Sequence, residues 1–265
     1  MTYGAMEDIK SLQQAEKDAV EAECLCISIG DTPILKDVSC CFPRHKITTI
    51  VGPSGSGKST LLRSFNRIGS LTHGYKESGA VKLFGCDVTG AFETVEDLRQ
   101  SVGMVFQKAC VFPCSIKDNV LFGISKQRKL SKSAGTETAE TALRRATLWE
   151  EVKDRLDEPA ASLSLGQKQR LCIARVLAMQ PKVLLLDEPT ASVDPLSVRA
   201  IENTLLSLKS DYTIIMVTHD LHQMRRIADH IVFLQDGDIV TQGTLEAIKN
   251  NTDDERIKTY FETLT

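Results

Sequence analysis

Short apolar runs and amphipathic segments alternate along the chain from about residue 23 onward. Three early runs, at 24–29, 38–42 and 47–51, have the length and residue types of β-strands. Turn-forming residues at 30–33 separate the first two runs. After the third run, apolar residues recur at helical spacing, which predicts a strand that leads through a turn into a helix.

The last third of the sequence alternates more regularly. Apolar runs at 183–186, 213–217 and 231–234 are separated by helical patterns at 197–209 and 221–228. Strands that alternate with helices form βαβ units, so this part predicts a largely parallel sheet. We therefore predict an α/β fold.

Two regions do not follow this alternation. Residues 1–21 are charged, contain several good helix formers and predict an N-terminal extension that is either a helix or a frayed tail. Residues 115–158 are mostly polar and predict helices. No internal repeat is apparent, so we expect one copy of the α/β unit.

Composition excludes several classes of protein. The chain has 265 residues, with 32 Lys and Arg against 35 Asp and Glu, which gives a formal net charge of −3. A protein that mainly grips nucleic-acid phosphates usually has a basic excess, so we expect no nucleic-acid partner. No apolar run approaches the roughly 18 residues that cross a bilayer, and the charged N-terminus does not resemble a secretory signal. We therefore expect a cytosolic chain whose 8 cysteines are reduced.

A phosphate-binding loop is the strongest chemical signal. Residues 52–59 read Gly-Pro-Ser-Gly-Ser-Gly-Lys-Ser and match the pattern G-x-x-x-x-G-K-[ST] between a predicted strand and a predicted helix. The glycines allow a tight turn that directs backbone N–H groups at phosphate oxygens, and the helix start adds the positive end of its dipole. Lys58 offers a positive charge to the β- and γ-phosphates, and Ser59 offers a hydroxyl to Mg²⁺. The sequence therefore predicts a nucleotide site.

Polar residues follow two of the later apolar runs. Ligands of parallel sheets bind at the carboxyl ends of the strands, so Asp187 is placed to hold Mg²⁺ through water. The next residue, Glu188, points in another direction and can accept a proton from an attacking water. The run at 213–217 ends in the same way before His219, which we expect to contact a γ-phosphate oxygen and to orient Glu188 and the water.

The remaining motifs resemble those of ATP-binding cassette (ABC) transporter ATPases, and they occur in the order of that family. Residues 163–167, Leu-Ser-Leu-Gly-Gln, are similar to the signature motif, and residues 106–107, Phe-Gln, to the Gln loop. Residues 191–194, Ala-Ser-Val-Asp, are similar to the D-loop, and His219 to the switch histidine. The resemblance covers about residues 23–250.

The resemblance implies a P-loop NTPase fold: a RecA-like α/β core, an antiparallel β layer near the N-terminus and an inserted α-helical subdomain at about 108–175. We expect an N-terminal extension at 1–21, the ABC ATP-binding domain at 22–252 and a C-terminal tail at 253–265. The resemblance also implies a homodimer. Two copies would pair head to tail and hold each ATP between the phosphate loop of one copy and the signature motif of the other.

The signature segment also has a physical reading of its own. Ser164 and Gln167 form an S-x-x-Q capping box that opens a helix at 167–179, so a helix N-terminus would face the γ-phosphate across the dimer. With the family motifs included, the residues expected to contact ATP are Ile29, Gly52, Pro53, Ser54, Gly55, Ser56, Gly57, Lys58, Ser59, Thr60, Gln107, Ser164, Gly166 and Gln167. Those expected at Mg²⁺ are Ser59, Gln107 and Asp187, and those expected to be catalytic are Lys58, Glu188 and His219.

Finer similarities point to one branch of the family. Segments 64–67, 103–108, 148–156 and 169–175 resemble the ATPases that import phosphate into bacteria. That branch implies an ATPase at the cytoplasmic face of the inner membrane, beneath two transmembrane permease subunits that a periplasmic phosphate-binding protein supplies. The stretch 110–115 is the expected contact for a coupling helix of the permease. Two alternatives remain: an importer of another solute, such as an amino acid or a metal, and a non-transport ABC ATPase of the iron–sulfur assembly type.

Two positions depart from the family pattern. The family usually has Gly where this chain has Leu165, and a side chain there crowds the approach to the γ-phosphate. The position that is expected to stack an aromatic ring on adenine is Ile29, which can bury one face of the base but lacks π-stacking. We expect both departures to affect the efficiency and base selectivity of the site.

Overall fold

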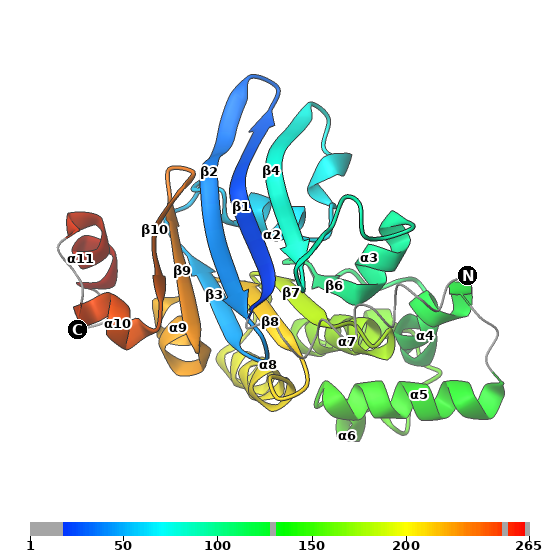
Figure 1. The fold of residues 1–265 in the computed structure, drawn as a ribbon. Helices are drawn as coiled ribbons and strands as arrows, with labels where there is room; N and C mark the ends of the chain where they lie inside the picture. Colours follow the sequence, from blue (N-terminus) through cyan, green and yellow to red (C-terminus); the bar gives the residue numbers. More distant parts are fainter. Residues whose placement is uncertain (1–17, 128–130, 251–253, 263–265) are drawn as a thin grey trace.

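The computed structural model describes residues 18–127, 131–250 and 254–262, which form two sheets with helices around them (Figure 1). Among these residues the larger sheet is 6-stranded, with the order β10-β9-β3-β8-β7-β6. Its strands are β3 (Ile47–Val51), β6 (Val102–Val105), β7 (Val183–Asp187), β8 (Thr213–Val217), β9 (His230–Gln235) and β10 (Asp238–Gly243). All adjacent pairs from β9 to β6 are parallel, and within the described part of this sheet only β10 runs antiparallel to its neighbour. The prediction of a largely parallel sheet is confirmed.

The central strands of this sheet are apolar because both of their faces are covered. Every residue of β3, β7 and β8 is buried. Helices α2 (Lys58–Ser64), α8 (Pro195–Leu208) and α9 (Leu221–Ile227) follow these three strands in turn. The strand ends are tied together, because Glu188 N–H donates to Val217 O and Thr218 N–H donates to Ile50 O. The three carboxyl ends therefore form one edge, where the candidate site lies.

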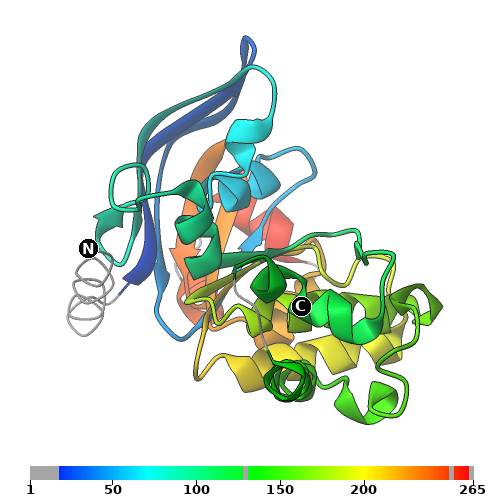
Figure 2. The ribbon, with the colours of Figure 1, turned by 90° about the vertical axis from the view of Figure 1, so that its right-hand side faces the viewer.

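The smaller sheet is antiparallel and has the order β2-β1-β4-β5. Its strands are β1 (Asp18–Ile29), β2 (Thr32–Pro43), β4 (Tyr75–Leu83) and β5 (Cys86–Asp87). Its inner face packs against α2, and the rings of Phe42 and Phe65 meet edge to face there with centroids 5.0 Å apart. Figure 2 shows this sheet on one side of the molecule, away from helices α4 to α8. The predicted antiparallel layer is present.

The start of β1 corrects the expectation for the N-terminal extension. Residues 18–21 belong to the strand rather than to a helix or tail, and Val20 pairs with both Phe42 and Leu83. Residues 1–17 lie outside the described part of the chain. Pairing on both sides decides the conformation of 18–21, because tertiary contacts override weak local propensities.

Helices make up most of the region between β6 and β7. They are α4 (Ile116–Gln127), α5 (Lys132–Arg145), α6 (Trp149–Val152) and α7 (Leu165–Ala178), preceded by α3 (Val95–Ser101) before β6. Short 3₁₀ turns, η1 (Gly69–Leu71) and η2 (Ala160–Ser162), lie outside these helices. Apolar residues of α4, α5 and α7 share a core with β6, β7 and β8. In the described ranges, no helix is both long enough and apolar enough to span a bilayer.

The C-terminal region is more ordered than a tail. Helices α10 (Leu245–Asn250) and α11 (Glu255–Phe261) follow β10. Ile257 and Phe261 of α11 pack with Val51 and Phe233 of the larger sheet, and α11 lies on the β9–β10 side of that sheet (Figure 1). The sequence did not indicate this helix or its contact with the strand that leads into the phosphate loop.

Candidate functional site

The phosphate loop connects β3 to α2. Gly57 adopts a left-handed conformation with φ 101° at the cap of α2, and a Cβ there would lie 2.7 Å from a methyl of Leu35. Gly52 is even more confined, because a Cβ there would lie 1.9 Å from the carbonyl oxygen of Leu234. The loop therefore needs glycine at both positions, and its backbone is fixed against β2 and β9.

The ammonium group of Lys58 is held by the loop itself. Its Nζ donates to Gly52 O at 2.9 Å and to Pro53 O at 2.7 Å. Burial lowers the pKa of Lys58, and the carboxylates of Glu188 and Asp187 oppose that shift. Beside it, the hydroxyl of Ser56 is buried and has no hydrogen-bond partner in the part of the chain that the structure describes. A cradle with a buried cation and an unsatisfied hydroxyl suits the oxygens of a phosphate chain.

Ser59 and Asp187 meet at the end of β7. Ser59 Oγ donates to Asp187 Oδ1 at 2.7 Å, and Arg63 Nη2 donates to Asp187 Oδ2 at 2.8 Å. Asp187 is buried, so the two bonds satisfy a carboxylate that has little access to water. The hydroxyl and carboxylate oxygens are the donors that Mg²⁺ prefers. The chemistry of this pair therefore fits the predicted magnesium position.

Glu188 lies between two polar side chains from other strands. Gln107 Nε2 donates to Glu188 Oε2 at 3.0 Å, and His219 Nδ1 lies 3.3 Å from the same oxygen. Glu188 has φ 45°, an uncommon conformation for a residue with a side chain, and its carboxylate contacts different partners from that of Asp187. Residues that follow β6, β7 and β8 are therefore brought together. The contact of His219 with Glu188 confirms the prediction from the sequence, whereas the bond from Gln107 to Glu188 was not predicted.

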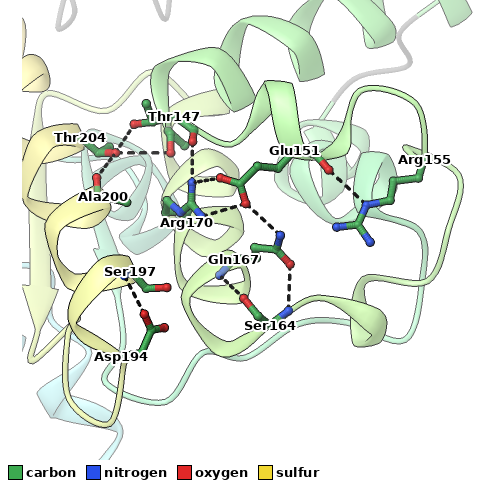
Figure 3. Close-up of polar contacts among 11 residues, drawn as sticks. Thr147, Glu151, Arg155, Ser164, Gln167, Arg170, Asp194, Ser197, Ala200 and Thr204 are labelled. Carbon is green, nitrogen blue, oxygen red and sulfur yellow. Dashed lines mark hydrogen bonds and ion pairs between the residues drawn. The ribbon is translucent and has the colours of Figure 1, made fainter.

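The signature segment lies at the start of α7, and its capping box is formed as predicted. Ser164 Oγ accepts from Gln167 N–H at 3.3 Å, and Gln167 Oε1 accepts from Ser164 N–H at 2.9 Å (Figure 3). The helix begins at Leu165, two residues before the predicted start. Gly166 packs against α8, where a Cβ would lie 2.3 Å from Ser197 Oγ.

A buried arginine fixes the side chain of Gln167. Arg170 donates to both carboxylate oxygens of Glu151, at 2.6 and 3.1 Å, and to the carbonyl oxygen of Thr147 at 2.6 Å. Gln167 Nε2 donates to Glu151 Oε2 at 2.9 Å, so α6 and α7 share one carboxylate (Figure 3). Within the chain, Ser164 and Gln167 therefore bond to each other and to Glu151 rather than to the phosphate loop.

Helix α7 also reaches the Gln loop and the stretch after it. Gln169 Nε2 donates to Phe106 O at 3.1 Å, next to Gln107. Arg175 Nη1 donates to Cys110 O at 2.8 Å, and its guanidinium lies over the ring of Phe112 at 4.3 Å. The segment 106–112 is thus tied to the same helix that begins with the signature segment.

Some predicted positions are less directly connected to this edge. Ile29 is 37% exposed at the tip of β1, where it pairs with Tyr75 of β4. Leu165 is 45% exposed at the start of α7, so its side chain projects from the surface that the signature segment presents. Pro53, Ser54 and Gly55 are exposed at the turn of the loop. All five of these positions are exposed to solvent.

Two residues at the site carried no sequence signal. Arg63 completes the bonding of Asp187, and Tyr260 of α11 accepts a hydrogen bond of 2.9 Å from Gly52 N–H. Arg63 lies on the exposed side of a helix where arginine is common. Tyr260 lies 208 residues after the glycine that it contacts, so only the folded structure reveals the pair.

Comparison with known proteins agrees with this geometry. The ABC transporter family profile matches residues 35–191, which include the phosphate loop, the signature segment and the Asp187–Glu188 pair. The phosphate import ATP-binding protein PstB of Mycoplasma capricolum subsp. capricolum is 45% identical over 232 residues, which cover 88% of this chain and 86% of that protein. The chain belongs to the ABC transporter family. PstB 1 of Yersinia pestis bv. Antiqua and of Yersinia pseudotuberculosis are each 44% identical over 233 residues, with the same coverage.

Solved structures of ABC proteins share the fold. CbiO1 from Clostridium perfringens, part of the ABC transporter complex cbiONQ, matches with a TM-score of 0.78 and 31% identity, over 94% of this chain and 96% of that one. A bacterial Atm1-family ABC exporter with ATP bound matches with a TM-score of 0.77 and 26% identity, over 94% of this chain and 42% of that one. The predicted ABC ATPase fold is confirmed, and the resemblance to phosphate-import ATPases is confirmed by sequence identity.

Proposed function

We propose that this protein is the ATP-hydrolysing subunit of an importer for inorganic phosphate. The similarity to PstB proteins, at 44–45% identity over 88% of the chain, carries the assignment of phosphate as the solute. The assembly of Lys58, Ser59, Asp187 and Glu188 at one sheet edge supports the hydrolysis of ATP to ADP and phosphate. Hydrolysis would drive transport through membrane partners.

Glu188 is the proposed general base. Its carboxylate would accept a proton from the water that attacks the γ-phosphorus, while the bond from that phosphorus to the bridging oxygen breaks and ADP leaves. Gln107 and His219 already contact one oxygen of this carboxylate, at 3.0 and 3.3 Å. They would therefore hold the carboxylate in place and, on binding, contact the γ-phosphate.

Lys58 would exchange partners when ATP binds. Its ammonium group now contacts two loop carbonyls, Gly52 O and Pro53 O, and phosphate oxygens would replace at least one of them. The remaining positions of the loop, from Ser54 to Thr60, would contact the phosphates through backbone N–H groups and hydroxyls. Ile29 would contact the base.

Ser59 and Asp187 are the proposed holders of Mg²⁺, with Gln107 as a further oxygen donor. A bound Mg²⁺ would neutralise part of the charge on the β- and γ-phosphates. The hydrogen bond of 2.7 Å between Ser59 and Asp187 supports this proposal, because the two oxygens lie next to each other.

The signature segment would complete the site in a homodimer. Ser164, Gly166 and Gln167 are presented at the start of α7, a helix of 14 residues whose N-terminus attracts negative charge. Because they bond within their own helix and to α6, they would serve the ATP of a second copy in a head-to-tail pair. Each ATP would then lie between two chains.

Membrane partners would contact the segment after the Gln loop. Phe106 and Phe122 expose 43% and 37% of their surface, and the ring of Phe122 stacks on that of Phe112. This face, around residues 110–115, fits a coupling helix of a permease subunit. Each copy in the homodimer would contact one of the two permease subunits. The protein would then lie at the cytoplasmic face of the inner membrane, with a periplasmic phosphate-binding protein supplying the permeases.

Uptake of radiolabelled phosphate tests the assignment. Bacterial cells that lack their own phosphate-import ATPase would receive this protein together with its cognate permeases and binding protein. We expect ATP-dependent phosphate uptake with the unaltered protein and none with Glu188→Gln. The same cells would be given labelled amino acids and metal ions.

The alternatives give distinct outcomes in this experiment. Uptake of an amino acid or a metal, without phosphate, would assign the ATPase to an importer of another solute. ATP hydrolysis with soluble partners only, and no uptake, would favour an ATPase of the iron–sulfur assembly type. Either result would overturn the assignment to phosphate.

A further inference from the structure

The C-terminal helix α11 makes a direct polar contact with the phosphate loop. The hydroxyl oxygen of Tyr260 accepts a hydrogen bond of 2.9 Å from the backbone N–H of Gly52, the first residue of the loop. Tyr260 lies outside the region 35–191 that the family profile covers, whereas Gly52 lies within it. It is not required by any of the motifs that predict ATP binding.

Gly52 is held on both of its backbone polar groups. Its carbonyl oxygen accepts from Lys58 Nζ at 2.9 Å, and its N–H donates to Tyr260. Binding of a triphosphate draws Lys58 toward the phosphates and weakens the first of these contacts. The contact with Tyr260 does not involve Lys58, so it can remain when Lys58 moves.

Packing of the Tyr260 ring holds its hydroxyl next to the Gly52 amide. Its ring stacks on that of Phe233 with centroids 4.6 Å apart, and Phe233 lies on β9 next to the strand that leads into the loop. Burial raises the pKa of Tyr260, and the bond from Gly52 opposes that shift, so the group stays neutral near pH 7. Stacking on Phe233 therefore fixes the ring independently of the hydrogen bond that its hydroxyl accepts.

The remainder of α11 does not cover the loop continuously. A cavity of about 630 Å³ lies beside it, and its lining includes Pro53, His219, Leu221, Thr259 and Tyr260. Pro53 and His219 therefore face open space between the site and the helix. The contact from helix to loop is concentrated at the Tyr260 hydroxyl.

We propose that Tyr260 is a positioning residue for ATP binding: its hydroxyl holds the Gly52 amide, and with it the start of the phosphate loop, in the geometry that receives the triphosphate. The inference rests on the nucleotide site of the proposed function and extends that site to the C-terminal helix. It predicts that ATP affinity depends on a hydroxyl that contacts no part of the nucleotide.

The test compares the unaltered full-length chain with Tyr260→Phe, which keeps the ring and its stacking on Phe233 but removes the hydroxyl. The dissociation constant for ATP would be measured by fluorescence titration, with and without Mg²⁺, alongside kcat and KM for hydrolysis. We expect the dissociation constant and KM to rise about fivefold, the value of one net hydrogen bond, with kcat changed less than twofold. Because the hydroxyl does not contact the metal, the rise should be the same without Mg²⁺.

Two further variants separate positioning from stability. Tyr212→Phe removes another buried tyrosine hydroxyl, which bonds to Arg145 away from the loop, and it should leave KM unchanged. Phe261→Leu weakens the packing of α11 but keeps the Tyr260 hydroxyl, so it should lower the melting temperature more than it raises KM. The inference is overturned if Tyr260→Phe binds ATP as tightly as the unaltered chain, or if KM follows the melting temperature across all three variants. ATP binding by the unaltered chain keeps the proposed nucleotide site in place in both cases, and its absence overturns that site as well.

Discussion

The hydroxyl of Ser59 and the carboxylate of Asp187 are joined by a hydrogen bond of 2.7 Å, although 128 residues separate them in the sequence. Ser59 lies in the first turn of α2, the helix that follows β3 and the phosphate loop. Asp187 is the last residue of β7, which is separated from β3 in the sheet by β8. Their contact brings the two proposed magnesium ligands to one point before any ligand is bound.

Replacing Ser59 with alanine should weaken the binding of ATP with Mg²⁺ far more than the binding of ATP alone. Loss of a contact to a charged group corresponds to about a ten- to hundredfold change in the dissociation constant. Titration with ATP in the presence of Mg²⁺ or a chelator measures the difference. Ser64→Ala is the matched control, because the hydroxyl of Ser64 bonds to Leu61 O within the same helix and should not affect either constant. Equal weakening with and without Mg²⁺ would remove Ser59 from the metal site.

Glu188→Gln should bind ATP and accumulate as a nucleotide-bound dimer, but hydrolyse ATP about 10²- to 10⁴-fold more slowly, because an amide cannot accept the proton of the attacking water. Gln107 and His219 retain an oxygen to contact, so the fold of the site should be unchanged. Single-turnover hydrolysis and size-exclusion chromatography with ATP measure the two effects. Glu158→Gln alters an exposed carboxylate that pairs with Arg155 and should hydrolyse ATP at the normal rate. Undiminished turnover in the Glu188 variant would exclude this residue as the base.

Leu165→Gly should raise the maximal rate of ATP hydrolysis severalfold. The leucine side chain is 45% exposed at the first position of α7, where the signature segment would approach the phosphates of the second copy. Its removal clears that approach, while glycine in a helix costs up to about 1 kcal/mol of stability. Steady-state hydrolysis and thermal unfolding measure both changes. Leu71→Gly removes a more exposed leucine, in η1, and should leave the rate unchanged; a rate that does not rise in Leu165→Gly would show that the leucine does not obstruct the dimer.

Glu151→Gln should destabilise the helical region and slow hydrolysis together. The side chain of Arg170 is only 6% exposed and depends on Glu151 for two of its hydrogen bonds, so a poorly satisfied buried donor would cost about 1–3 kcal/mol. Gln167 would lose its anchor at the same time. Urea unfolding and the hydrolysis rate measure the two effects, with Glu150→Gln as the control because the adjacent Glu150 is exposed and pairs only with surface cations. If both variants behave alike, the shared carboxylate does not align the signature segment.

The sequence predicted those parts of the site that depend on local pattern and sheet topology. The loop at 52–59 follows from spacing alone, and the meeting of Glu188 and His219 follows from two parallel strands that end at one edge. The capping box at Ser164 was predictable because both of its bonds are local. For the same reason the helix start was accurate to two residues.

Contacts between elements that are distant in the chain were not predictable. The pairing of Arg170 with Glu151 requires α6 to dock on α7, and the bond from Gly52 to Tyr260 requires the C-terminal helix to pack on β9. Residues 18–21 were predicted to belong to the N-terminal extension, yet pairing with the neighbouring strands places them in β1. In each case the deciding partner lies outside any sequence window.

Helix α7 runs from Leu165 to Ala178 without a break, and its 14 residues span about 21 Å. One end presents the segment that would meet a neighbour's triphosphate, and Arg175 near the other end donates to the carbonyl oxygen of Cys110, the first residue of the proposed permease contact. Because the helix is rigid, a movement at one of its ends can reach the other end without a series of small side-chain shifts between them. If nucleotide binding tilted the N-terminal end of α7, the C-terminal end would move by a comparable distance. ATP hydrolysis and the opening of the permease would then be coupled through this one helix.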